Sequence, residues 1–239
     1  ICLCKIDNIE KWQDYIPATN GVLIGGFNLL NKWMIRSEVR DALAKLYVRN
    51  LDTNIEEELI ITDEQVISPG ASLMQKDRNT NKIYIAYQSP KTPGKAYIYN
   101  VLTKEKKLVK EEIVPSGHNP NDYVVQRLSC DSHDGKKIPL TITRHKNTQL
   151  DGSANLLLYA YGSYGNSMGP AFSSNILSLI NRNIIVVTAH VRGGMERGYN
   201  WWKDGKMLNK KNTFKDYLSS AKFLIEKKYT SKGKIIGMG

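Results

Sequence analysis

The residues with the clearest chemical potential are a tyrosine and two glycines that follow a short apolar run. The run begins at Leu156, and the segment Tyr159–Gly165 reads Tyr-Ala-Tyr-Gly-Ser-Tyr-Gly. Because it follows a buried strand, this segment should lie at the carboxyl edge of a sheet, where α/β folds place their sites. Glycine lets the backbone bend sharply there, and the hydroxyl of Tyr161 is able to donate a hydrogen bond to a developing oxyanion. A tight turn with packed aromatic side chains is the alternative that the same residues allow.

A second glycine-rich segment follows the next apolar run. The segment 190–198 reads His-Val-Arg-Gly-Gly-Met-Glu-Arg-Gly and comes after the run Ile184–Ala189. Paired glycines can cradle a phosphate, but neither the Gly-x-x-x-x-Gly-Lys-Ser/Thr nor the Gly-x-Gly-x-x-Gly spacing of nucleotide loops is present. His190 is a candidate base or ligand, although a single histidine at a strand end is more often structural. The other three histidines lack the spacing with carboxylates that indicates a metal site, so we predict no metal.

Basic residues dominate the charge of the chain. The 34 Lys and Arg residues outnumber the 23 Asp and Glu residues, which gives a formal net charge of +11 and a pI near 9.4. The stretch Lys203–Lys211 follows Trp201-Trp202, and basic residues beside aromatic ones can bind single-stranded nucleic acid. Because the other lysines are scattered, a solvated surface loop is the simpler interpretation, and we expect no nucleic-acid partner.

The second half has the pattern of a mostly parallel sheet with helical crossovers. The pair Asp134-Gly135 lies between two alternating runs, 124–132 and 137–145, which predicts a hairpin. Short apolar runs and helical patterns then alternate, as in α/β folds. The expected strands are Leu156–Tyr161, Ile184–His190 and Lys234–Met238, and the expected helices are 171–183 and one that starts with a capping-box variant at Thr213–Asp216. We expect the second helix to have one apolar face, formed by Phe214, Tyr217, Leu218, Ala221, Leu224 and Ile225.

The first half reads as short strands separated by polar turns. β-branched and aromatic residues gather in seven short runs, and no long helical pattern interrupts them. The runs are Ile1–Ile6, Val22–Leu30, Trp33–Val39, Lys45–Asn50, Glu58–Ile61, Lys82–Gln88 and Ala96–Asn100, with turns at Asn31-Lys32, Leu51–Asn54, Asp77–Asn81 and Thr103–Lys107. The pattern predicts an antiparallel meander, and a sandwich, a barrel and propeller blades all remain open. The linker Glu111–Pro120 marks the expected boundary between two domains, residues 1–112 and 113–239.

The cysteines and the start of the chain bear on its location. No apolar run approaches the ~20 residues that span a bilayer. The start, Ile1–Asp7, lacks the basic and apolar regions of a signal peptide. Cys2, Cys4 and Cys130 form an odd set without zinc spacing. We therefore expect reduced thiols in a cytoplasmic protein that has no membrane partner.

Taken together and in this order, the motifs resemble the prolyl oligopeptidase family, and within it the oligopeptidase B (protease II) branch. The resemblance rests on Tyr159–Gly165, on the segment 172–179 and on Ala189–Gly194. The segments Trp202–Lys206 and Lys210–Tyr217 match as well, and Trp12–Pro17 and Ala96–Asn100 are similar to late propeller strands of the family. The match covers essentially the whole chain.

This resemblance implies a β-propeller that caps an α/β-hydrolase domain, in a serine endopeptidase that cleaves short peptides after Arg or Lys without a cofactor. Residues 1–112 would hold the last one or two propeller blades. Residues 113–239 would hold the amino-terminal half of the hydrolase domain, whose first five strands have the order 1-2-4-3-5. Tyr161 matches the family tyrosine whose hydroxyl helps to form the oxyanion hole.

The catalytic triad of the family has no counterpart among these residues. The family carries its nucleophile in a Gly-x-Ser-x-Gly-Gly turn directly after the position of Gly239, and its Asp and His follow. We therefore expect the triad to lie outside this chain and the chain alone to be inactive. Ser163, Ser173 and Ser174 are not substitutes, because we expect none of them in a strand–turn–helix with flanking glycines.

Other departures from the family pattern concern specificity. The segment Gly169-Pro170-Ala171 lacks the acids that many members carry there, Ala160 replaces a usual glycine, and the basic net charge would repel cationic substrates. The expected partners are short peptide substrates of the parent enzyme and a downstream carboxy-terminal fragment. A decayed pseudoenzyme remnant and a basic nucleic-acid-binding protein are the two alternatives.

Overall fold

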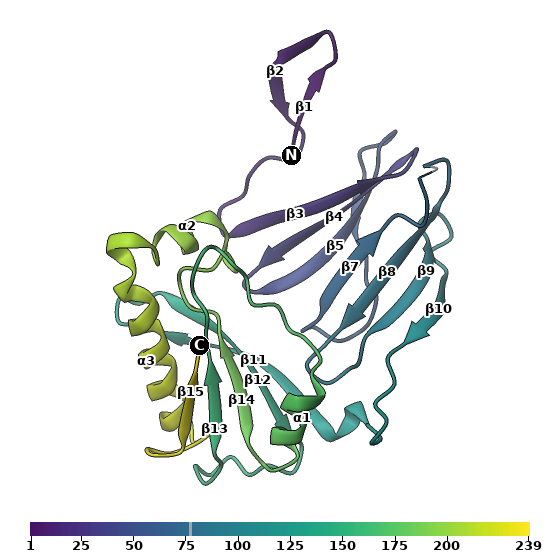
Figure 1. Cartoon of the computed structure of the whole chain (residues 1–239). Coiled ribbons are helices and arrows are strands. Elements are labelled where there is room, and N and C mark those ends of the chain that lie inside the picture. Colours follow the sequence, from purple (N-terminus) through teal and green to yellow (C-terminus); the bar gives the residue numbers. More distant parts are fainter. Residues whose placement is uncertain (77) are drawn as a thin grey trace.

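The chain folds into two β-rich halves that lie side by side (Figure 1). The computed structural model describes residues 1–76 and 78–239. Within these residues, the first half holds the strands β1 to β10, and the second half holds β11 to β15 together with the helices. No helix of the described part is both long enough and apolar enough to cross a membrane.

Two four-stranded antiparallel sheets dominate the first half. One has the order β3-β4-β5-β6 and the other β10-β9-β8-β7, so chain neighbours pair as in a meander, as predicted. Residues from both sheets share one core, in which Ile35 and Val48 belong to the same cluster as Ile83 and Ile85. The strands are β3 (Val22–Leu29), β4 (Trp33–Arg40), β5 (Leu43–Asn50), β6 (Glu56–Glu58), β7 (Ser68–Ser72), β8 (Lys82–Gln88), β9 (Lys95–Asn100) and β10 (Lys106–Glu111). A separate hairpin, β1 (Cys2–Lys5) and β2 (Asn8–Asp14), precedes them.

Several strands of the first half differ from the sequence prediction. β7 and β10 lie where we expected connections or assigned nothing, and the turn predicted to reach Lys107 gives way to β10 at Lys106. β2 begins at Asn8, and only its end overlaps Trp12–Pro17, the segment that resembles a propeller strand. β2 and β10 are exposed along their whole length, so they lack the apolar alternation that identifies a strand. The strand predicted at Glu58–Ile61 is also wrong, because β6 ends at Glu58, and Leu59 and Ile61 are buried in the core as irregular backbone. The turn predicted at Asp77–Asn81 lies partly outside the described residues, since it includes Asp77.

One five-stranded sheet forms the second half. Its order is β11-β12-β14-β13-β15, so the order expected from the resemblance is confirmed. β11 and β12 form an antiparallel hairpin, β12 pairs antiparallel with β14, and β13 runs parallel to both β14 and β15. Gly135, with a φ of 77°, turns the hairpin as predicted. The strands are β11 (Tyr123–Asp131), β12 (Lys137–His145), β13 (Leu156–Tyr159), β14 (Ile185–Ala189) and β15 (Ile235–Met238).

The helices α1 (Ser174–Ile180) and α3 (Lys211–Glu226) cover opposite faces of this sheet. α1 buries Leu177 and Ile180 against Val186, whereas α3 buries Leu224 in the cluster that contains Ile185. Neighbouring residues of a strand point to opposite faces, so the two clusters lie on the two sides of β14. The short helix α2 (Gly198–Lys203) connects β14 to α3.

The apolar face predicted for α3 is wrong in part. Phe214 and Leu218 are 62% and 59% exposed. The fully buried positions of α3 are instead Thr213, Asp216, Ser220 and Leu224, of which only one is apolar. Two of the buried polar side chains, Thr213 and Asp216, form hydrogen bonds with Arg192 of the loop after β14, and Ser220 donates to the backbone carbonyl of Asp216.

Candidate active site

Tyr161 lies at the carboxyl edge of the sheet, two residues after the end of β13. Its side chain is 37% exposed and lines a cavity of about 320 Å³. The opposite walls come from the start of α3 and the end of β15, and include Phe214, Tyr217 and Gly239. Gly239 packs closely against this edge, since a Cβ placed on it would lie 2.7 Å from the carbonyl oxygen of Ala160. The residue that the sequence singled out is therefore accessible and lies beside the chain as it leaves β15.

The backbone after Tyr161 makes a tight turn with three left-handed residues. The φ angles are 64° at Gly162, 56° at Tyr164 and 71° at Gly165. The amide of Gly165 donates to the carbonyl of Gly193 (2.9 Å), which ties the turn to the second glycine-rich loop. The alternative interpretation is a tight turn with packed aromatic rings. The turn is present, but Tyr164 is 86% exposed, so its ring is not packed.

Three loops meet at Gly162, Gly193 and Gly205, which we call the glycine junction. A Cβ on Gly162 would lie 2.5 Å from Thr213 Cγ2 and 2.9 Å from the carbonyl oxygen of Arg192. A Cβ on Gly193 would overlap the carbonyl of Gly162, and one on Gly205 would overlap the amide of Gly193. The glycines thus allow backbone segments to touch, which explains them without a phosphate ligand.

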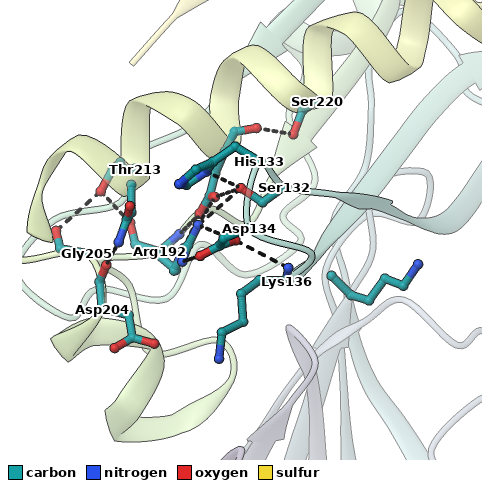
Figure 2. A network of polar contacts seen from close by, with 12 residues as sticks. Ser132, His133, Asp134, Lys136, Arg192, Asp204, Gly205, Thr213 and Ser220 are labelled. Atoms are coloured by element: carbon teal, nitrogen blue, oxygen red, sulfur yellow. Dashed lines mark hydrogen bonds and ion pairs between the residues drawn. The ribbon is translucent and has the colours of Figure 1, made fainter.

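Arg192 belongs to a buried polar network next to this junction (Figure 2). Its side chain is 1% exposed. Nε and Nη2 donate to the two oxygens of Asp216 at 2.9 and 2.6 Å, and Nη1 donates to Asp134 Oδ2 at 2.6 Å. Nη2 also donates to Ser132 Oγ at 3.1 Å. Burial disfavours the guanidinium charge, but the hydrogen bonds and charges of Asp216 and Asp134 outweigh it and raise the pKa of Arg192.

This network corrects the predicted start of α3. The helix begins at Lys211, and its N-cap position has no side-chain hydrogen bond, so Thr213–Asp216 is not a capping box. The hydroxyl of Thr213 instead donates to the carbonyl oxygen of Arg192 at 2.7 Å. Asp216 is fully buried against the same arginine. The Thr-x-x-Asp spacing was misleading because both side chains point across to another segment instead of back along their own helix.

His190 is buried inside the sheet and has a structural role. It is 2% exposed, and Nε2 lies 2.8 Å from Thr141 Oγ1. Nδ1 lies 3.9 Å from Glu196 Oε1. Burial lowers the pKa of His190, and the neighbouring Glu196 offsets only part of this effect. The structural interpretation of this histidine agrees with its buried contact to Thr141, and the same histidine also lines a second cavity of about 380 Å³, beside Tyr159 and Met238.

None of the three serines excluded as nucleophiles lies in a strand–turn–helix. Ser173 is the N-cap of α1, where its hydroxyl accepts from the amide of Ile176 at 3.4 Å, and Ser174 is the first residue of that helix. Ser163 lies 2.7 Å from the ammonium of Lys210. A fourth serine, Ser167, also matches the Gly-x-Ser-x-Gly pattern, since residues 165–169 read Gly-Asn-Ser-Met-Gly. It lies in an irregular loop several residues after β13, so it is not a nucleophile turn between a strand and a helix.

A turn of the first half docks beside these loops. Asp41 and Ala42, between β4 and β5, have φ angles of 49° and 60°. The amide of Ala42 donates to the carbonyl of Glu196 at 2.9 Å, and Asp41 forms an ion pair with Arg197 at 2.7 Å. The carboxylate of Glu196 in turn accepts from the amide of Met168 at 2.9 Å. One hairpin tip of the first half is therefore connected to the loop that follows Tyr161.

The described residues include no group of three or more His, Cys, Asp and Glu side chains that could hold a metal ion. No pattern in the sequence predicted the Arg192 network, since its members come from three separate segments. The only local indication was the Asp134-Gly135 hairpin, which placed Asp134 in a turn but not against Arg192.

Comparisons with known proteins bear on both halves of the chain. A family model described as "Prolyl oligopeptidase, N-terminal beta-propeller domain" matches residues 1–112, and one described as "Prolyl oligopeptidase family" matches residues 170–239. The chain is 36% identical over 231 residues to dipeptidyl aminopeptidase BI of Pseudoxanthomonas mexicana, which covers 96% of this chain and 31% of that protein. It is 37% identical over 169 residues to Protease 2 of Moraxella lacunata, which covers 71% of this chain and 24% of that protein.

Solved structures show the same likeness in three dimensions. Oligopeptidase B from Trypanosoma brucei, with covalently bound antipain, has a TM-score of 0.84 at 32% identity, covering 93% of this chain and 32% of that one. Prolyl oligopeptidase B from Galerina marginata has a TM-score of 0.86 at 27% identity, covering 95% and 32%. The chain thus spans about a third or less of the relatives that it matches. With its propeller blades followed by the first five strands of an α/β-hydrolase sheet, the chain belongs to the prolyl oligopeptidase family.

Proposed function

We propose that this chain is part of a serine endopeptidase that hydrolyses short peptides after Arg or Lys. Residues 1–112 are assigned to the carboxy-terminal part of its propeller domain, and residues 113–239 to the amino-terminal half of its peptidase domain. The observation that carries the proposal is the position of Tyr161, exposed at the carboxyl edge of the sheet and lining one cavity with Gly239. Catalytic groups of α/β sheets gather at this edge.

Tyr161 has the role of an oxyanion donor in this proposal. The family resemblance places the nucleophile directly beyond β15, and Gly239 marks that side of the cavity. A carbonyl held there would meet the phenol hydroxyl of Tyr161 from one side and the amide after the nucleophile from the other. A donor fixed in advance stabilises the tetrahedral intermediate more than the substrate, so it accelerates the chemical step.

The preference for Arg or Lys is the finer part of the proposal. It is supported by the likeness to oligopeptidase B and to Protease 2. The names of other relatives, dipeptidyl aminopeptidase BI and prolyl endopeptidase, describe different cleavage modes. The absence of acids from Gly169-Pro170-Ala171 and the net charge of +11 weaken electrostatic attraction of a basic side chain, so specificity needs a direct test.

The proposed partners and location complete this picture. The substrates are short peptides, no cofactor takes part, and a separate carboxy-terminal fragment that adds to β15 is the protein partner where the two are made as separate products. The three cysteines are free, which supports a reducing compartment such as the cytoplasm.

The proposal is tested by assaying the protein at its natural length against three fluorogenic peptides. One carries a blocked amino terminus and Arg at the cleavage site, one carries Pro there, and one releases a dipeptide from a free amino terminus. We expect the Arg peptide to have the highest kcat/KM and a fluorophosphonate probe to label the protein. Preference for either other peptide overturns the Arg/Lys assignment, and no hydrolysis with no labelling favours the pseudoenzyme alternative.

A further inference from the structure

Lys210 connects the start of α3 to the turn after Tyr161. It stands between the short 3-10 helix η2 (Met207–Asn209) and α3. Its ammonium donates to the carbonyl oxygen of Gly162 at 2.5 Å and to Ser163 Oγ at 2.7 Å. Both acceptors lie within two residues of Tyr161 along the chain. The lysine therefore holds the backbone that sets the direction of the tyrosine.

The ammonium of Lys210 has no carboxylate partner in the described part of the chain, where its two hydrogen-bond acceptors are neutral. It is partly buried, and burial is the cause that lowers the pKa of this lysine. A charge that is partly removed from water without a counter-ion costs free energy, and a carbonyl and a hydroxyl offset only part of that cost. A neutral side chain of the same length would avoid the cost, so the charge itself calls for an explanation.

The location of the charge supplies that explanation. The ammonium lies 5.9 Å from the centre of the Phe214 ring, and Phe214 lines the cavity that also contains Tyr161. Positive charge at this position favours any negative charge that develops in the cavity, and it does so most strongly where water is excluded. The same ammonium donates to the carbonyl of Gly162. One group therefore both anchors the turn after Tyr161 and supplies a positive electrostatic field.

We propose that Lys210 is a positioning residue for the Tyr161 turn, which it fixes through Gly162 and Ser163 while adding positive charge beside the cavity. The inference rests on the proposed peptidase function for its effect on catalysis. Its effect on the turn does not depend on that function, and the two are separated below.

The experiment compares Lys210→Met with Lys211→Met in the protein at its natural length. Lys211 is the next residue along the chain and is exposed, so it is a matched control for loss of one positive charge. For Lys210→Met we expect kcat to fall by roughly 10- to 100-fold with KM within about twofold, because the interaction stabilises the transition state more than the substrate. For Lys211→Met we expect no change in either constant. In Lys210→Ala, added ethylammonium should restore part of kcat, which a variant with a merely damaged fold would not show.

A second measurement does not require peptidase activity. Hydrogen exchange of the amides in residues 161–166 should be faster in Lys210→Met than in Lys211→Met, with the rest of the sheet unchanged. Faster local exchange in a protein that cleaves no peptide would support the positioning role while contradicting the proposed function. Unchanged kcat together with unchanged exchange in Lys210→Met overturns the inference. Exchange that rises equally over the whole chain, without rescue by ethylammonium, overturns it as well.

Discussion

Arg192 and Lys210 approach the glycine junction from different elements and hold their positive charge in different ways. Arg192 is 1% exposed and is bound by Asp216, Asp134 and Ser132. Lys210 is partly buried, and within the described residues the hydrogen bonds of its ammonium go to the carbonyl of Gly162 and the hydroxyl of Ser163, with the Phe214 ring nearby. Carboxylates raise the pKa of the arginine, whereas burial lowers that of the lysine.

This difference separates a cation that maintains the framework from one that is available to a ligand. Two carboxylates largely cancel the field of Arg192, so its value lies in the geometry that it imposes on three chain segments. The charge of Lys210 is not cancelled in this way and lies beside the loop that carries Tyr161. The comparison predicts that loss of the arginine mainly affects stability and that loss of the lysine mainly affects catalysis.

Replacing Arg192 with Met should have the largest effect on stability. The substitution leaves the carboxylate of Asp216 buried without a partner, and Asp216 is 0% exposed. Breaking a buried ion pair in this way costs about 3–5 kcal/mol. We expect a drop of this size in the unfolding free energy, measured by urea denaturation. Arg182→Met, which removes an exposed arginine at the end of α1, should stay within about 0.5 kcal/mol. Equal losses in the two variants would contradict the framework role.

Replacing Tyr161 with Phe should affect catalysis and leave stability nearly unchanged. Loss of one oxyanion donor lowers kcat by about 10²–10³-fold, or about 2.7–4 kcal/mol. The side chain is 37% exposed, so removing its hydroxyl should change the unfolding free energy by less than about 0.5 kcal/mol. Steady-state kinetics at saturating substrate and a urea melt check the two halves of this expectation. Tyr164→Phe is the matched control, and an unchanged kcat in Tyr161→Phe would remove that residue from the proposed mechanism.

Replacing Asp134 with Asn should have a smaller effect than the loss of Arg192. Asp134 is the outer partner of the arginine, with 35% of its side chain exposed, so solvent screens the pair and Asp216 remains in place. We expect about 1 kcal/mol of lost stability at neutral pH. The bond to Arg192 overcomes a burial penalty and lowers the pKa of Asp134, so its contribution is lost as pH falls through that lowered value. The difference between the wild type and Asp134→Asn should therefore shrink on acidification, and a difference that grows would be inconsistent with this pairing.

Alkaline pH should reveal the smallest of the expected effects. Because burial lowers the pKa of Lys210, the folded chain releases that proton before the unfolded chain does. The contribution of this lysine to stability should rise as pH passes through the lowered value, and should be complete above the unfolded value of about 10.4. Urea melts of the wild type and of Lys210→Met at several alkaline pH values measure this difference. Arg192 stays charged over the same range, so a wild-type curve parallel to that of Lys210→Met would contradict the contrast between the two cations.

Much of the fold could be predicted because its signals are local. The short apolar runs of β13, β14 and β15 alternate with helical segments, and the Asp134-Gly135 pair closes the hairpin of β11 and β12. The strands that were missed have no such signal. β10, with the sequence Lys-Lys-Leu-Val-Lys-Glu, is exposed throughout and is held by pairing with β9, so its identity depends on a neighbour and not on its own pattern.

The candidate site shows the same limit more sharply. Tyr161 could be singled out because it follows an apolar run and stands beside a glycine. Arg192, Asp216 and Asp134 could not be connected, because an ion pair between distant segments leaves no periodicity in the sequence. For the same reason the sequence predicts a cap at Thr213 and Asp216 and a buried face with Phe214 and Leu218, whereas hydrogen bonds to Arg192 place Thr213 and Asp216 on the buried side of α3.

The parallel pairing of β13 with β15 also has a consequence for the time course of synthesis. About 75 residues separate the two strands, and a ribosome adds roughly 5–20 residues per second, so the outer edge of β13 waits on the order of 4–15 s for its partner. β14 emerges earlier and occupies the other edge, and the segment that forms α3 is then made while the first edge is still open. A nascent chain of this kind presents an apolar strand edge for seconds, which is long enough for a chaperone to bind.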